Sequence, residues 1–557
     1  MQDPARHRSQ SLDKAPSDCN NASRRFSRLG QKTWADLLIA ALAMAAYVLW
    51  IYRFRYRGLL GEDDLYCVLV GLLDGVRSGA HLAADSQYGK AFSFGYIAAI
   101  YRYASQQTLA DPQRLIALIN AIGFWAAAAS CCFSWLLTWT LYGLRCATVT
   151  LIVFALSPMM LELGTSGHPI LPALALFAAG SLCLLLPAGG VRAFLLAVPG
   201  SLLLLAAMVT RAEVALALPF VVLARADFGS FSRLLKSAGL RAAAVVVATA
   251  AFLLLKWVYV DTTPGSGDLG GFLAEFIRFR DIPVGVAVLA FNCGIVTVVA
   301  GLIALLAVFR GAHVVSAQRA ALLHSAVGPL LLIVPALVFW IANPRPGRHF
   351  ILCLAGISML IGWLISCAYS ARPVLVYALA FGVVAGNQAM GALTGPLILK
   401  YAPSKLLVLP GGIHHMPRGV PVGTSWSYHR ALVGEQTRVT AFAESAQEPC
   451  DEKTLVLSLD ATQIFFNLYS VSDANAEGWA ARERKLGRFS YLEAHIRGRT
   501  VVALLEFDGW PRDAARDALA DPAFRDFKLV RDPNNISIYD HAAIPPERVA
   551  HLGCALD

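Results

Sequence analysis

Long apolar segments, separated by short polar ones, occupy the chain up to about residue 395. A helix needs about 20 apolar residues to cross the hydrocarbon layer of a membrane, and several segments reach this length. Shorter segments are expected to tilt or to be partly buried by their neighbours. The pattern predicts eleven transmembrane helices, at residues 34–56, 113–141, 146–162, 171–187, 192–210, 213–226, 241–260, 284–309, 320–341, 350–369 and 373–395.

The composition agrees with this prediction. Of the 557 residues, 57% are hydrophobic and 15% are charged, whereas soluble proteins carry about 25% charged residues. The formal net charge is +10, but the arginines lie mostly in short loops between apolar segments, which is typical of membrane topology. We therefore expect membrane lipids as partners and no nucleic acid.

The basic residues also predict the orientation in a cell inner membrane, because loops rich in Arg and Lys stay on the cytoplasmic side. With the N-terminus in the cytoplasm, the odd number of helices puts the C-terminal part outside, in the periplasm. Three arginines at the outer end of the first helix do not follow this rule, namely Arg53, Arg55 and Arg57. The predicted inner side carries Arg24, Arg25, Arg28, Lys32, Arg145, Arg192, Arg225, Arg233, Lys236, Arg241, Arg310, Arg319 and Arg372.

Three regions follow from this pattern: a cytoplasmic basic segment (1–33), a transmembrane domain (34–395) and a periplasmic domain (396–557). The first outer loop, residues 57–112, is long and contains two short apolar stretches. Their helical spacing predicts helices at Tyr66–Val76 and Ala91–Tyr103 that lie at the membrane interface.

Beyond Lys400 the pattern changes to short β-like stretches that alternate with charged, helix-forming ones such as Pro511–Leu519. This alternation predicts a compact α/β domain. Cys450 and Cys554 fall in this domain and could pair if it lies outside the cytoplasm. The predicted strands are Leu406–Leu409, Thr454–Leu459, Thr500–Phe507 and Asn535–Tyr539.

Three consecutive acids, Glu62, Asp63 and Asp64, stand directly outside the first apolar segment. Anionic groups repel one another and resist loss of water, so such a cluster at a membrane is costly unless it is solvated or used. One Asp would be enough to cap the Tyr66–Val76 helix. The functional interpretation makes an Asp the general base that takes a proton from an acceptor hydroxyl.

Cations in the outer loops are the second candidate group. Arg345, Arg348 and His349 lie in NPRPGRH, where topology alone disfavours positive charge. Two arginines and a histidine can hold a phosphate through charge-assisted hydrogen bonds, although attraction to lipid headgroups is an alternative. Lys90 and Arg211 are further candidate phosphate ligands.

Four more residues are candidate substrate ligands. Tyr88 precedes Lys90 in the first loop, and it could equally be an aromatic anchor at the interface. Glu162 and His168 occupy the short outer loop in MLELGTSGHPILP. Glu213 lies beside Arg211 with hardly any loop around them, and charges this close to hydrocarbon usually pair or face a cavity.

These segments resemble the GT-C superfamily, membrane glycosyltransferases that take sugars from polyprenyl-phosphate carriers. The resemblance rests on GEDDLY (61–66), TRAE (210–213) and NPRPGRH (343–349), together with the interfacial helices and the outer C-terminal domain. It is nearest to the bacterial aminoarabinose, galacturonic-acid and arabinofuranose transferases. His168 stands where several relatives have an acid.

The resemblance implies a hexosyl- or pentosyltransferase that needs no cofactor beyond its lipid-linked donor. Asp63 or Asp64 would deprotonate a glycan, lipid or protein acceptor, and the cations would stabilise the leaving polyprenyl phosphate. Three adjacent acids could bind a divalent metal, but metal independence is expected. The alternatives are a transporter or flippase for a lipid-linked sugar, which predicts broken helices and internal repeats, and a sensor, which leaves the acids unexplained.

Overall fold

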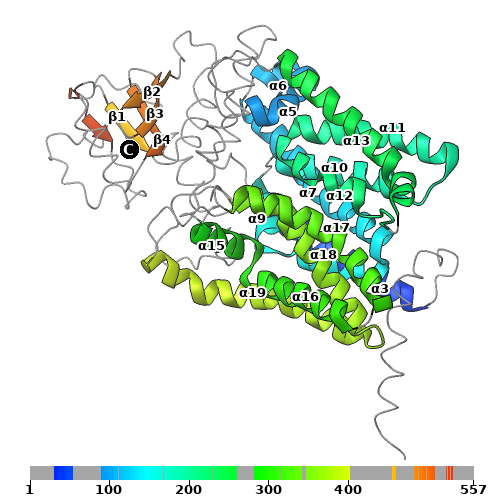
Figure 1. Cartoon of the computed structure of the whole chain (residues 1–557). Coiled ribbons are helices and arrows are strands. Elements are labelled where there is room, and N and C mark those ends of the chain that lie inside the picture. The colour runs from blue at the N-terminus through cyan, green and yellow to red at the C-terminus, as the bar shows by residue number, and fades with distance from the viewer. Residues whose placement is uncertain are drawn as a thin grey trace, which may run out of the picture.

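The computed structural model of the chain contains a helical bundle and a smaller β-sheet (Figure 1). In the bundle it describes residues 31–53, 90–110, 112–166, 169–228, 230–259, 282–314, 316–341 and 347–401, and beyond it residues 454–458, 482–486, 489–496, 499–507, 522, 525–526 and 528–530. The helices are α3 (Gln31–Arg53), α5 (Lys90–Tyr103), α6 (Gln106–Ala110), α7 (Pro112–Tyr142), α8 (Leu144–Ala155), α9 (Pro158–Ser166), α10 (Ile170–Leu185), α11 (Gly190–Thr210), η2 (Ala212–Ala217), α12 (Leu218–Leu223), α13 (Phe231–Tyr259), α15 (Ile282–Cys293), α16 (Ile295–Val314), α17 (Ser316–Trp340), η4 (Gly347–Phe350), α18 (Ile351–Ala368) and α19 (Pro373–Tyr401).

Each predicted transmembrane segment coincides with one of these helices or with two in succession. Six helices in the described part of the chain are long and apolar enough to cross a membrane, and five more apolar helices are shorter. The prediction of a polytopic helical membrane protein is therefore confirmed, while the count of eleven spans stays a prediction. Helix α19 continues to Tyr401, past the boundary predicted at residue 395.

Two predicted segments are each divided into two helices. The first breaks before Pro158, where the Ser157 hydroxyl accepts a hydrogen bond from the Met160 amide at 3.2 Å and caps α9. The second breaks at Gly294, whose φ of 93° separates α15 from α16. The amide group of Asn387 closes this break, donating to the Thr297 hydroxyl at 2.7 Å and accepting from the Thr297 amide at 3.1 Å.

The centre of the bundle is α18, which packs against α8, α16 and α17. In its span, 78% of the residues are buried, whereas the share is 28% in α3, α13 and α19. The outer helices expose large apolar side chains, among them Leu38, Leu254 and Phe381. Such side chains suit a helix whose outer face meets hydrocarbon.

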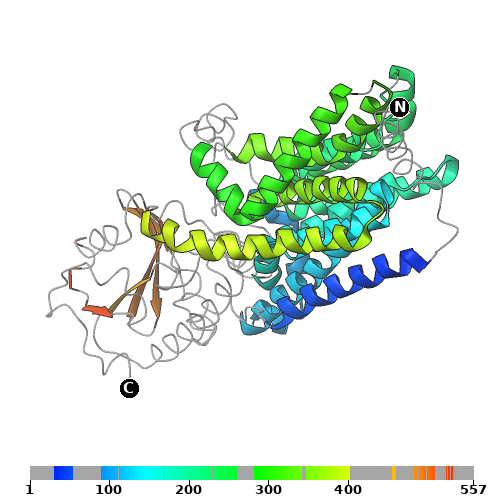
Figure 2. The ribbon, with the colours of Figure 1, turned by 90° about the horizontal axis from the view of Figure 1, so that it is seen from below.

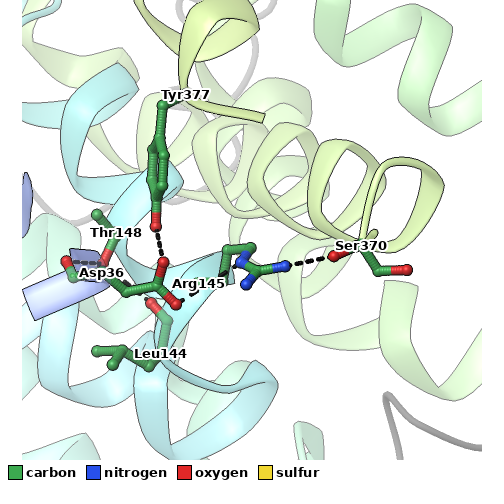
Figure 3. A network of polar contacts seen from close by, with 6 residues as sticks. All are labelled: Asp36, Leu144, Arg145, Thr148, Ser370 and Tyr377. Atoms are coloured by element: carbon green, nitrogen blue, oxygen red, sulfur yellow. Dashed lines mark hydrogen bonds and ion pairs between the residues drawn. The ribbon is translucent and has the colours of Figure 1, made fainter. Parts of the chain in front are cut away.

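A polar network joins the first and last long helices to α8 (Figure 3). The hydroxyl of Tyr377 on α19 donates to Asp36 Oδ1 on α3, and Arg145 Nε lies 3.6 Å from Asp36 Oδ2. Arg145 Nη1 also donates to the Ser370 carbonyl at 2.6 Å, and the Thr148 hydroxyl donates to the Asp36 carbonyl at 3.3 Å. These bonds tie the N-terminal parts of α3 and α19 to α8, and the N-terminal ends of α3 and α19 lie on the same side of the bundle (Figure 2).

The C-terminal region forms a five-stranded mixed sheet in the order β2-β3-β4-β1-β5. Strand β1 pairs in parallel with β4 and β5, and β3 pairs antiparallel with β2 and β4. The strands are β1 (Thr454–Ser458), β2 (Arg482–Leu486), β3 (Phe489–Ile496), β4 (Arg499–Phe507) and β5 (Lys528–Val530).

Of the predicted strands, Thr454–Leu459 and Thr500–Phe507 are confirmed as β1 and β4. The segments Leu406–Leu409 and Asn535–Tyr539, the helix Pro511–Leu519, and both Cys450 and Cys554 lie outside the described residues. Strands β2, β3 and β5 were not among the predicted strands. Strand β2 reads RERKL and lies at an edge of the sheet, where charged residues protect against unwanted pairing.

Candidate functional site

Helix α11 ends at Thr210, and the chain turns at Arg211 into the short η2 helix. Arg211 has an extended backbone (φ −157°, ψ 110°) between the two helices. Its side chain is among the largest that the fold buries completely, at 2% exposure. Non-helical backbone within a membrane bundle is tolerated where it is buried in protein or lines a cavity, so this turn is a candidate site.

The Arg211 guanidinium is held by Glu213, two residues later. Its Nε donates to Glu213 Oε1 at 2.7 Å, and its Nη2 lies 2.5 Å from the same oxygen. Glu213 is 7% exposed and lies in the first turn of η2, where the helix dipole favours negative charge. The pairing of Arg211 with Glu213 that the sequence suggested is therefore present.

His349 completes this cluster from a segment 136 residues away. Its Nδ1 lies 2.7 Å from Glu213 Oε2, so each carboxylate oxygen of Glu213 has a different partner. On its other side, the imidazole stacks on the Trp340 ring, with centroids 4.0 Å apart and planes at 17°. His349 is 7% exposed, and both its position and its ring plane are fixed.

The electrostatics of this cluster follow from its composition. The charges of Arg211 and Glu213 cancel, and a protonated His349 adds one positive charge. Removing one member of a buried ion pair typically costs about 3–5 kcal/mol, because the other charge stays buried without compensation. The three side chains therefore act as one unit in a site that water reaches poorly.

Several predicted site segments converge on this unit. The η4 helix, which contains His349, contacts α9, α15, α17 and α18, and η2 contacts α5, α11 and α17. Glu162 lies on α9, Lys90 is the first residue of α5, and Arg348 lies in η4. The fold thus brings together backbone segments that carry five of the predicted residues, namely Lys90, Glu162, Arg211, Glu213 and Arg348, beside His349.

The remaining predicted residues fall elsewhere. Glu62, Asp63, Asp64, Tyr88, His168 and Arg345 lie outside the described residues, as does the predicted helix Tyr66–Val76. Their roles remain predictions. Within the described part of the chain, no group of three or more His, Cys, Asp or Glu residues could hold a metal ion.

Two aromatic residues at the site have roles that the sequence analysis missed. Trp340 ends α17 and resembles an ordinary core residue, and only its nearness to NPRPGRH could have indicated its contact with His349. Tyr96 belongs to the stretch Ala91–Tyr103, which we predicted to lie at the membrane interface. The predicted helix Ala91–Tyr103 is confirmed as α5, but Tyr96 is buried, at 5% exposure.

Tyr96 is unusual because its hydroxyl has no hydrogen-bond partner among the residues that the structure describes. Burial raises the pKa of this hydroxyl and keeps it neutral. The preceding Gly95 lets α5 approach α11 closely, since a Cβ there would lie 2.5 Å from Val209 Cβ. Helix α5 also contacts η2, so Tyr96 belongs to the packing that surrounds the Arg211 turn.

No protein-family model and no curated relative matches the chain. Among solved structures, the fold is similar to ArnT from Cupriavidus metallidurans bound to undecaprenyl phosphate, with 15% identity, a TM-score of 0.42, and coverage of 79% of this chain and 85% of ArnT. It is also similar to the oligosaccharyltransferase AglB from Archaeoglobus fulgidus in complex with an inhibitory peptide and a dolichol-phosphate, with 12% identity, a TM-score of 0.43, and coverage of 79% and 64%. At these values the two structures do not transfer an activity to this chain.

Proposed function

We propose that this protein is a membrane glycosyltransferase that moves a sugar from a polyprenyl-phosphate donor to an acceptor on the outer face of the membrane. The observation that carries this proposal is the buried unit of Arg211, Glu213 and His349 at a break between membrane helices. Its members come from the TRAE and NPRPGRH segments, which are 136 residues apart at Glu213 and His349. A purely structural role does not require two cationic side chains, Arg211 and His349, at this turn.

In this mechanism the cations stabilise the leaving group. As the bond between the anomeric carbon and the phosphate oxygen breaks, the polyprenyl phosphate gains negative charge. Arg211 and His349 stabilise that charge more in the transition state than in the ground state, because they are fixed before the reaction begins. Glu213 fixes both partners with its two oxygens, so we assign it a positioning role rather than direct contact with the sugar.

Arg345, Arg348 and Lys90 extend the proposed phosphate site. Arg348 precedes His349 in η4, and Lys90 begins α5. Arginine suits this task because its planar guanidinium can contact two phosphate oxygens at once. Glu162, His168 and Tyr88 are the proposed ligands of the sugar or the acceptor.

The acceptor is activated by an aspartate of the first outer loop. Asp63 or Asp64 takes the hydroxyl proton as the acceptor oxygen forms its bond to the anomeric carbon. Glu62 lies beside them and keeps the local field negative. The proton goes to the aspartate, and the electron pair of the broken bond leaves with the phosphate. We expect this step to need no metal or organic cofactor.

A second candidate function, a flippase for a lipid-linked sugar, is favoured by the breaks in the helices. The structure shows such breaks before Pro158, at Arg211 and at Gly294, and transporters often build their sites from broken helices. A flippase moves its substrate without cleaving it. The two functions are therefore separated by the products.

The test is a product assay with the purified full-length protein in lipid nanodiscs. A panel of polyprenyl-phosphate sugars and lipid, glycan and peptide acceptors is supplied, and released polyprenyl phosphate is measured by mass spectrometry. Release that depends on the acceptor is expected, and Arg211→Gln should reduce it strongly while Arg233→Gln, an exposed control, should not. Movement of intact donor without release by the wild-type protein would instead support the flippase.

A further inference from the structure

Helix α15 (Ile282–Cys293) connects the candidate site with one of the breaks in the bundle. It contacts η4, which contains His349, and α9, which carries Glu162 (Figure 1). At its C-terminal end the chain turns at Gly294 into α16. The angle at Gly294 therefore decides how α15 lies against the segments that build the site.

Near the N-terminal end of α15, Gly285 lies directly against the backbone of Ile341. A Cβ at Gly285 would collide with the Ile341 carbonyl oxygen and lie 2.9 Å from the carbonyl carbon. Ile341 follows Trp340, the last residue of α17, whose ring stacks on the His349 imidazole at a centroid distance of 4.0 Å. Because glycine offers no side chain that could yield at this contact, a displacement of α15 is passed on to the backbone next to Trp340.

The break itself leaves the direction of α15 open. Gly294 has a φ of 93°, and glycine adopts positive and negative φ about equally well. Gly294 also has no side chain that could cap the first turn of α16, where a helix leaves amide groups without an intrahelical partner. The angle between the two helices must therefore be fixed by contacts from elsewhere in the fold.

Asn387 on α19 supplies these contacts. Its Oδ1 accepts a hydrogen bond from the amide of Thr297, the third residue of α16, at 3.1 Å, and its Nδ2 donates to the Thr297 hydroxyl at 2.7 Å. The carboxamide also fills the space in which a Cβ of Gly294 would stand. Asn387, at 3% exposure, thus takes the place of the N-cap side chain that Gly294 lacks and fixes the turn.

The length of α15 enlarges small changes at this turn. Gly285 and Gly294 are nine residues apart, which is about 13 Å along a helix that rises about 1.5 Å per residue. A rotation of about 5° at Gly294 would move Gly285 by about 1 Å over this length. A misplacement of about 1 Å that arises far from the chemistry can lower an enzyme's rate about 10²-fold. A change at Asn387 is therefore expected to reach the site.

We propose that Asn387 is a positioning residue for His349 and acts through α15. By fixing the turn at the start of α16, it holds α15 against the end of α17. This contact keeps the His349 ring aligned with Glu213, whose Oε2 lies 2.7 Å from the ring Nδ1. The inference rests on the proposed function, in which His349 stabilises the leaving phosphate. Asn387 itself is assigned no contact with the substrate.

Asn387→Leu tests the proposal, because leucine has a similar volume but can form neither hydrogen bond to Thr297. We expect this variant to release polyprenyl phosphate about 10²-fold more slowly than the wild-type protein, the cost of a misplacement of about 1 Å. The matched control is Tyr377→Phe, which also removes a buried hydrogen bond of α19, but one to Asp36 on α3. Its rate of release should stay close to the wild-type value.

A second measurement follows His349 without any need for turnover. Solid-state NMR of the protein with isotope-labelled histidine reports the ring nitrogens, and the signal of His349 is assigned by its absence from His349→Gln. Asn387→Leu should shift this signal, because the hydrogen bond between Nδ1 and Glu213 is then misaligned. Tyr377→Phe should leave the signal at its wild-type position.

Gly285→Ala tests the other end of α15. The added Cβ must push α15 away from the backbone of Ile341, so this variant should shift the His349 signal and slow the release as Asn387→Leu does. Gly301→Ala in α16 is the matched control, since its Cβ would also come close to a neighbour, 2.7 Å from Cγ2 of Ile357 on α18. It should leave the His349 signal unchanged.

Three results would overturn the proposal. One is a folded Asn387→Leu variant with the wild-type His349 signal. Another is an equal shift in Tyr377→Phe, which would mean that any loosening of α19 disturbs the site. The third is a folded Gly285→Ala variant whose His349 signal is unchanged.

Two further arrangements keep the test decisive. If Asn387→Leu does not fold, Thr297→Val decides, because it removes only the bond to the hydroxyl and should shift the His349 signal by a smaller amount; no shift would overturn the proposal as well. If the wild-type protein releases no polyprenyl phosphate, the proposed function fails, while the His349 signal still tests the positioning through α15.

Discussion

Replacing Glu213 should separate the structural cost of the buried cluster from its function. In Glu213→Gln, Arg211 keeps its charge at 2% exposure but loses its carboxylate partner. Two unit charges about 4 Å apart attract by about 4 kcal/mol at an effective dielectric constant of about 20, which agrees with the roughly 3–5 kcal/mol measured when buried pairs are broken. The single variant should therefore lose about 3–5 kcal/mol of unfolding free energy.

The double variant Arg211→Met, Glu213→Leu removes both charges and should recover most of that loss, since apolar residues of similar volume often replace a buried ion pair without penalty. A remainder of about 1–3 kcal/mol is expected because His349 loses its hydrogen-bond partner. Unfolding is followed by tryptophan fluorescence in one detergent, and activity by the release of polyprenyl phosphate. The double variant should be stable but inactive.

Two outcomes would refute this reasoning. A double variant as unstable as Glu213→Gln would mean that the loss comes from packing at the turn and not from the uncompensated charge of Arg211. A stable double variant with wild-type turnover would mean that the cluster only holds the helices together, and the proposed phosphate site would then lie elsewhere.

Three further predictions concern the bundle. Tyr377→Phe removes the hydrogen bond to Asp36 and should cost about 1.5–3 kcal/mol of unfolding free energy, whereas the control Tyr369→Phe, at an exposed position, should cost little; equal losses would argue against the network. Gly294→Ala should destabilise the break between α15 and α16 for two reasons. Its φ of 93° should cost about 1–3 kcal/mol by itself, and the added Cβ would lie 2.4 Å from Asn387 Oδ1. An unchanged unfolding midpoint would contradict this. Tyr96→Phe removes a buried hydroxyl that has no hydrogen-bond partner among the described residues and should keep or raise the midpoint, and a lower midpoint would mean that this hydroxyl makes a stabilising contact.

The sequence predicted the helical architecture well because hydropathy alone decides which segments can enter a membrane. It did not predict the interruptions. The break at Gly294 depends on a contact between Asn387 and Thr297, which are 90 residues apart, and no local pattern carries that information. Strand β2 was not predicted for a different reason. Its charged sequence suits an exposed sheet edge and lacks the alternation of apolar and polar residues that marks a half-buried strand.

For the site, the sequence singled out Arg211 with Glu213, because charges near hydrocarbon usually pair, and His349 separately, as a cation of an outer loop. Only the fold shows that His349 is a partner of Glu213 and that Trp340 stacks on it. The network around Asp36 could not be predicted, since Asp36 lies in the first turns of an apolar helix and Tyr377 reads as one of many aromatic residues. The outer acids remain predictions from the sequence.

The most direct test of the central claim concerns Asp63 and Asp64. Asparagine caps a helix about as well as aspartate but is not a base. If an aspartate activates the acceptor, Asp63→Asn should reduce turnover by about 10²–10⁴-fold, with Asp64→Asn milder, while the unfolding midpoint stays at the wild-type value. The measurement is the release of polyprenyl phosphate from the donor in the presence of acceptor. A double variant, Asp63→Asn with Asp64→Asn, that turns over like the wild-type protein would mean that these acids only cap a helix, and the glycosyltransferase proposal would be withdrawn.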